Sequence, residues 1–169
     1  MSNENQGVEY LKVVAEILET EMDLKPTNPS STVPNDRRVF LYNQNFVLPT
    51  YDYLFLIISE TPGKVISAQN HFDPALNQDV QELIMQREVG IDIMSRNAEA
   101  RQRKEEVLMA LASAYSQQQQ EKNGFRVFAY SQSFVDVSEN EGAGRINRYR
   151  ASIILHVRYT KQKDIAYFD

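Results

Sequence analysis

The segment LIMQREVGIDI, residues 83–93, runs directly into the longest helical pattern in the chain, and the expected fold is built around this junction. Apolar side chains occupy alternate positions of the segment, which is the period of a strand with one buried face: Leu83, Met85, Val89, Ile91 and Ile93. From residue 97 onward the apolar residues recur at spacings of three and four instead. This spacing predicts one long helix over 97–118 that frays through Gln117–Gln120.

Other stretches predict the remaining elements. Apolar spacing predicts an N-terminal helix over 8–22, and residues 51–59 are apolar on both faces, as in a strand buried on both sides. Thr61-Pro62-Gly63 favours a turn from which 64–70 returns as the second arm of a hairpin. Further strands are expected over 39–42, 80–94, 125–137 and 148–159, with loops over 25–36, 71–77 and 138–144. Together these elements predict one α+β domain over 1–169: an antiparallel β-sheet flanked by an N-terminal helix and one long central helix.

Composition excludes several classes of protein. The chain has 169 residues, a formal net charge of −5 and a pI near 5.1, which argues against a general nucleic-acid binder. It has no cysteine, so disulfides and thiolate zinc sites are excluded. The longest aliphatic and aromatic run, residues 53–58, is far short of the roughly 20 residues that a membrane helix needs.

Candidate catalytic and ligand-binding residues lie scattered along the chain. His71 and His156 are far apart and lack metal-ligand spacing, and no serine stands in a G-x-S-x-G motif. The segment 142–144, Gly-Ala-Gly, precedes a strand and not a helix, so it lacks the geometry of a phosphate loop. We therefore expect no catalytic residue, no cofactor and no metal. A small enzyme or ligand-binding domain, with a site that forms only in three dimensions, stays as an alternative.

Three features are candidates for contact with other proteins. In the last strand Arg148, Arg150 and Arg158 share one face, which is typical of a solvated sheet face but also suits an acidic neighbour or passing DNA. Met109 falls on the polar side of the long helix, as an isolated exposed residue or as an interface contact. Tyr167 and Phe168 make the C-terminus too apolar for an idle tail.

The order of elements resembles that of the tail terminator (neck, or head-tail joining) proteins of tailed bacteriophages. The resemblance rests on RRVFLYNQNFVLPTYDYLFLII, EVGIDIMSRNAEARQRKEEVLMAL and GFRVFAYSQSFVDVSENEGAGRINRYRASIILHVRYTKQKDIAYFD, which are residues 37–58, 88–111 and 124–169. It implies a structural virion protein without enzymatic activity, assembled in the bacterial cytoplasm. Its copies would form a hexameric ring that caps the tail tube.

The implied partners are further copies of the chain, the tail tube protein, the head-tail connector or stopper, and the sheath in tails that have one. DNA would pass through the central channel without specific binding. A baseplate or connector adaptor of the same virion is the alternative. In either role Met109, Arg148, Arg150, Arg158, Tyr167 and Phe168 are the predicted interface residues.

Overall fold

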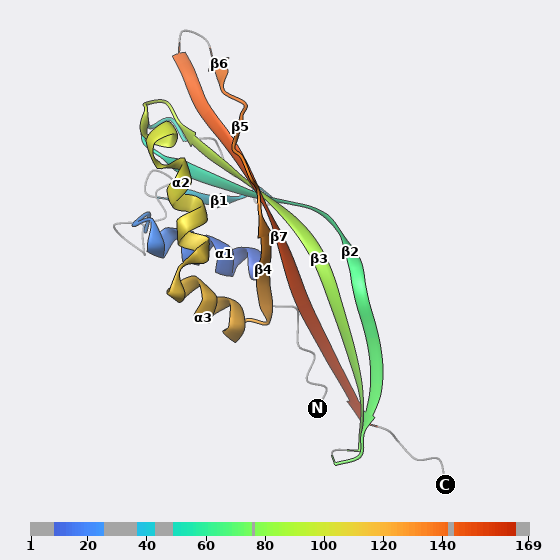
Figure 1. Ribbon diagram of the computed structural model, residues 1–169. Helices are drawn as coiled ribbons and strands as arrows, with labels where there is room; N and C mark the ends of the chain where they lie inside the picture. The colour runs from blue at the N-terminus through green and yellow to red at the C-terminus, as the bar shows by residue number, and fades with distance from the viewer. Residues whose placement is uncertain (1–8, 26–36, 43–48, 76, 142–143, 165–169) are drawn as a thin grey trace.

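In the part of the chain that the structure describes, a seven-stranded mixed sheet organises the fold, and three helices lie on one side of that sheet (Figure 1). The computed structural model describes residues 9–25, 37–42, 49–75, 77–141 and 144–164. The helices are α1 (Tyr10–Glu21), α2 (Glu99–Ala112) and α3 (Ala114–Lys122). The strands are β1 (Val39–Leu41), β2 (Phe55–Asp73), β3 (Gln78–Ser95), β4 (Phe125–Tyr130), β5 (Val135–Asp136), β6 (Glu139–Glu141) and β7 (Gly144–Asp164).

The predicted fold class is wrong in three respects. Strands hold 52% of the described residues and helices 26%, so the protein is mostly β. The sheet has the order β1-β2-β3-β7-β4, and β1 pairs in parallel with β2, so the sheet is mixed and not antiparallel throughout. The long central helix is also absent, because α2 and α3 are separate elements.

Ser113 divides the expected long helix. Its backbone is extended, with ψ at 159°, and its side chain accepts a hydrogen bond from the Ser116 backbone amide at 3.0 Å. Serine favours such a cap because its hydroxyl replaces the carbonyl that the amide would otherwise use inside a helix. The spacing of apolar residues does not show whether Ser113 continues one helix or caps the next. The sequence therefore predicts α3 as a continuation of α2.

The hairpin predicted at Thr61-Pro62-Gly63 is wrong as well. Strand β2 continues through these residues to Asp73, and the pairing with β3 shifts register between Thr61 and Lys64. A bulge accommodates Pro62, which has no amide hydrogen for a sheet ladder. The real turn follows Asp73, whose carboxylate accepts a hydrogen bond from the Ala75 amide, and Asn77 has a φ of 54°.

Strand boundaries near the C-terminus also differ from those predicted. The stretch 125–137 forms β4 and β5 as two strands, and the expected loop 138–144 contains β6. Strand β7 extends well beyond 148–159 at both ends, and it pairs with β3, β4, β5 and β6. It is therefore the strand on which most of the sheet is assembled.

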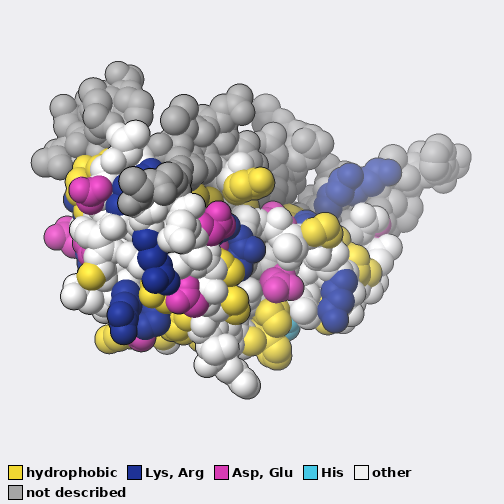
Figure 2. All heavy atoms as spheres, turned by 90° about the horizontal axis from the view of Figure 1, so that it is seen from above, with side chains coloured by type: hydrophobic (Ala, Val, Ile, Leu, Met, Phe, Trp, Pro, Cys, Tyr) yellow, Lys and Arg dark blue, Asp and Glu magenta, His cyan; other side chains and the backbone are white. Residues whose placement is uncertain are grey.

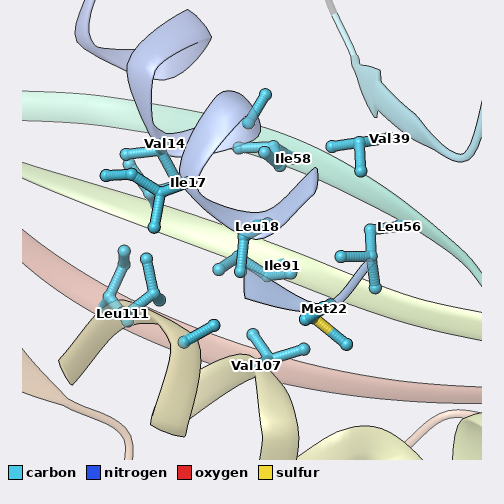
Figure 3. Packing of buried hydrophobic residues seen from close by; sticks show 14 of the residues in the cluster. Val14, Ile17, Leu18, Met22, Val39, Leu56, Ile58, Ile91, Val107 and Leu111 are labelled. Carbon is cyan, nitrogen blue, oxygen red and sulfur yellow. The ribbon is translucent and has the colours of Figure 1, made fainter. Parts of the chain in front are cut away.

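The main core lies between the sheet and the helices (Figure 3). Ile17 and Leu18 of α1 and Leu111 of α2 are completely buried against it. From β3 the same core receives Val89, Ile91 and Ile93, which confirms the predicted alternation for residues 89–93. Leu83 and Met85 lie outside this core and are only partly buried, so the prediction is wrong for the first half of the segment. A smaller cluster on the opposite face contains Phe40, Phe55, Ile57, Met94 and Ile146. These two clusters explain why the first residues of β2 are buried on both faces, as predicted.

Polar contacts of α2 orient the helical layer. Arg103 forms an ion pair with Glu99 at 3.2 Å, and its Nη2 donates to the carbonyl of Met22 at the end of α1. Glu99 also accepts a hydrogen bond from the Leu54 amide. One guanidinium therefore satisfies a helix C-terminus and joins two helices.

None of the described helices is both long enough and apolar enough to cross a membrane.

Candidate interaction surfaces

Strands β2, β3 and β7 continue together past the helices as a three-stranded arm (Figure 1). We define the arm as residues 64–73, 78–86 and 157–164. Among the described residues, β1 pairs with β2 only at 56–58 and β4 reaches β7 no further than Val157, so beyond Val157 no described strand covers either edge of the arm. The outer edge of β2 carries no Lys, Arg, Asp or Glu from Val65 to Phe72.

Large apolar side chains on the arm face solvent. Val65 is 56% exposed, and Ile66 and Phe72 are each 46% exposed. Long apolar sheet edges that lack charges are templates for pairing with another chain, and monomeric proteins usually protect them. The sequence did not predict this surface, because it favours a turn at residues 61–63. The uncharged run VISAQNHF, residues 65–72, was the feature that could have indicated an exposed edge.

A polar cluster marks the base of the arm, where the core ends. Arg87 pairs with Glu60 at 3.1 Å, and Glu60 is also hydrogen-bonded to the Tyr10 hydroxyl. Burial and the neighbouring Glu60 raise the pKa of Tyr10 above its ordinary value. At this point Gly63 packs so closely that an added Cβ would lie 2.4 Å from the Gln86 carbonyl oxygen. The cluster thus connects α1 to the first residues of the arm.

Two of the predicted interface arginines bind a carboxylate of their own chain. The Asp92 side chain is buried, and it accepts hydrogen bonds from Arg150 at 2.6 and 2.7 Å and from Arg148 at 2.9 Å. Burial raises the pKa of Asp92, but the two guanidinium groups outweigh burial and hold the pKa below its ordinary value. Arg148 also lies 3.5 Å from Glu139. The sequence alone does not place Asp92 beside these arginines, because that requires the register of β3 with β7.

The other predicted interface residues have different positions. Arg158 pairs with Glu82 on the arm, and Met109 projects from α2 with 71% of its surface exposed. Tyr167 and Phe168 lie outside the described residues. Figure 2 shows hydrophobic side chains at the surface among charged side chains of both signs.

A further exposed aromatic group lies on the open face, which we define as the sheet face opposite the helices. Phe128 is 65% exposed, and its ring stacks on His156 with centroids 4.3 Å apart. His156 belongs to the same face of β7 as Arg150 and Arg158, because side chains two residues apart along a strand share a face. Sequence analysis placed Phe128 in a strand but did not predict that it is exposed.

A groove of about 510 Å³ separates α3 from β4, the outermost strand on this side. Its floor includes Gln120, which is buried and not frayed as predicted. The Gln120 amide donates to the Leu111 carbonyl and the Ser116 hydroxyl and accepts from the Val127 amide. The bond from Val127 joins α3 to the sheet edge, and the bond to Leu111 joins α3 to α2, so the side chain is structural.

Within the described residues, no group of three or more His, Asp or Glu side chains is placed to hold a metal ion. No protein-family model matches the chain, and no curated protein matches it. Function is therefore inferred from the exposed surfaces.

Proposed function

We propose that the protein is a structural subunit of a bacteriophage neck, a tail terminator whose copies form a ring that caps the tail tube and joins it to the head connector. The observation that carries this proposal is the arm. Beyond Val157 no described strand pairs with its edges, and Val65, Ile66 and Phe72 are exposed, which are features that an isolated soluble domain normally avoids. Such an arm suits a subunit that becomes buried on assembly, and the resemblance to tail terminators supplies the particular assembly.

A ring of the proposed kind functions by shape, so it needs no reactive group. Its partners would be neighbouring copies, the tail tube and the connector or stopper, with DNA passing through the channel. The acidic net charge supports this role, because a basic channel would retain the DNA that has to slide through it. A baseplate or connector adaptor would use the same arm and remains the second candidate within the virion.

An enzymatic role has less support from the geometry. In the groove between α3 and β4, the polar atoms of Gln120 already have partners: its amide oxygen accepts from the Val127 amide, and its amide nitrogen donates to the Ser116 hydroxyl. Binding sites normally combine an apolar pocket with a few convergent polar groups that a ligand can reach.

The test is assembly of the purified chain, measured by mass photometry and negative-stain images with and without tail tubes. We expect rings with about six copies of the 19.5 kDa chain, or rings that appear when tubes are added. A Val65→Ser, Ile66→Ser, Phe72→Ser triple variant should lose assembly, whereas Tyr42→Ser, which alters an exposed aromatic residue away from the arm, should retain it. A wild-type chain that stays monomeric in both conditions would refute the proposal.

A further inference from the structure

The turn between α3 and β4 contains the only Asn-Gly pair in the sequence, Asn123-Gly124. In such a pair the backbone nitrogen of the glycine can attack the side-chain amide carbon of the asparagine. The new N–C bond closes a five-membered succinimide ring, and ammonia leaves with the proton of the attacking nitrogen. Water then opens the ring at either carbonyl, which gives aspartate or isoaspartate. Glycine favours this reaction because it has no side chain to hinder the attack.

The folded turn keeps the two reacting groups apart. Asn123 has a ψ of 11°, so the Gly124 nitrogen nearly eclipses the Asn123 nitrogen, whereas ring closure needs it on the side of the Asn123 Cβ. The amide nitrogen that would leave, Nδ2 of Asn123, donates to the Gln119 carbonyl at 2.7 Å. The attacking nitrogen of Gly124 donates to the Glu121 carbonyl at 3.4 Å. Both groups thus close the C-terminus of α3, and the ring can form only after the last turn releases them.

Hydrogen bonds anchor this turn on both sides. Gly124 has a φ of 68°, which glycine adopts freely, and its carbonyl accepts a hydrogen bond from the Arg158 amide of β7 at 3.0 Å. On the helical side, Gln120 accepts from the Val127 amide at 2.8 Å, and this bond joins the end of α3 to β4. Release of Asn123 therefore requires a local opening of the end of α3, which costs less free energy than global unfolding.

We infer that Asn123 is a covalent modification site, at which the folded turn suppresses deamidation and each opening of the α3 C-terminus permits it. The rate of deamidation then measures how often this end of α3 leaves the sheet edge. The reaction needs only water besides the chain itself. It is independent of the proposed ring, because Asn123, Gly124 and their hydrogen-bond partners all belong to one copy.

Neither product of the reaction restores the original turn. A carboxylate at position 123 has no hydrogen to donate to the Gln119 carbonyl, and its negative charge lies at the end of α3 where the helix dipole is also negative. Isoaspartate in addition inserts a methylene group into the main chain, directly before the glycine whose carbonyl pairs with Arg158. Modified chains should therefore open at this turn more readily than unmodified ones.

The first test compares the native chain with the chain unfolded in guanidinium chloride, both in the same mildly alkaline buffer. Peptide mapping by mass spectrometry, with fragmentation that separates aspartate from isoaspartate, follows every asparagine over time. In the unfolded chain Asn123 should react faster than every other asparagine, since no other is followed by glycine. In the native chain its reaction should be slower by roughly tenfold or more. Equal rates at Asn123 in the two states, or a faster asparagine elsewhere in the unfolded chain, would overturn the inference.

A matched pair of variants tests the opening step. Gln120→Ala removes the bond to the Val127 amide and should raise the native deamidation rate at Asn123 several-fold. Gln118→Ala, at an exposed position of the same helix, should leave that rate unchanged. Circular dichroism establishes that both variants are folded. A folded Gln120→Ala chain that reacts at the wild-type rate would show that opening of α3 does not control the reaction.

The effect of the product is tested separately, so it does not depend on whether Gln120→Ala folds. Asn123→Asp introduces the product carboxylate and should lower the melting temperature, because the bond to the Gln119 carbonyl is lost. The control is Asn140→Asp, at an exposed position of β6, which should leave the melting temperature unchanged. Equal melting temperatures of Asn123→Asp and wild type would overturn the inferred loosening of the turn.

Discussion

Asp92 and Arg150 form a forked ion pair across the central pairing of β3 and β7. The Arg150 Nε lies 2.7 Å from one carboxylate oxygen and the Nη2 lies 2.6 Å from the other. The two residues are also direct partners in the strand register. Since the carboxylate is only 3% exposed and Arg148 shares it, the pair fixes two arginines of the open face in one arrangement.

Replacing Asp92 should destabilise the fold. We expect Asp92→Asn to lower the free energy of unfolding by about 2 kcal/mol, because a neutral amide leaves two partly buried guanidinium groups without their charged acceptor. Urea denaturation followed by circular dichroism measures this change. Asp136→Asn, at an exposed carboxylate, is the control and should change stability little. Equal stability of Asp92→Asn and wild type would contradict a stabilising role for the pair.

The same carboxylate should make stability depend on pH. The pKa of Asp92 is lowered in the folded state from the ordinary value of 3.8, so its contribution is complete above that value and is lost as the pH falls through the folded pKa. The difference in unfolding free energy between wild type and Asp92→Asn should therefore be constant near neutral pH and shrink below about pH 4. A difference that grows under acid would reverse the assigned direction of the pKa shift.

Gly63 should be irreplaceable at the base of the arm. In Gly63→Ala the new Cβ would lie 2.4 Å from the Gln86 carbonyl oxygen and 2.6 Å from Cδ of Arg87, so backbone has to move. We expect a loss of about 1–3 kcal/mol and faster amide hydrogen exchange at 64–73 and 78–86. Gly90→Ala is the matched control, since its nearest neighbour is the rotatable Ser59 hydroxyl at 3.1 Å. Comparable effects at both glycines would show that the close approach at Gly63 is not the cause.

Gln120 should contribute far more to stability than the glutamines beside it. Gln120→Ala removes the acceptor for the Val127 amide at 2.8 Å and the donor to the Ser116 hydroxyl at 2.9 Å, at a cost of about 2 kcal/mol. The exposed Gln118→Ala should be nearly neutral, within about 0.5 kcal/mol. Thermal unfolding of the two variants tests this, and similar melting temperatures would mean that the buried hydrogen bonds add nothing.

Periodicity in the sequence determined the elements whose side chains meet the main core. The alternation over 89–93 and the helical spacing in 8–22 are confirmed in β3 and α1, because burial of one face imposes that period directly on the residues. The apolar run before Ser59 likewise predicted a strand buried on both faces.

Tertiary structure alone decided the features that depend on distant partners. Strand β2 passes through Thr61-Pro62-Gly63 because β3 pairs with it on both sides of the bulge, and this long pairing outweighs the local preference for a turn. The arginines of β7 acquired an intrachain partner only when the register brought Asp92 beside them. The exposure of Val65, Phe72 and Phe128 also could not be predicted from the sequence. An apolar residue in a strand has the same local sequence pattern whether or not a helix covers it.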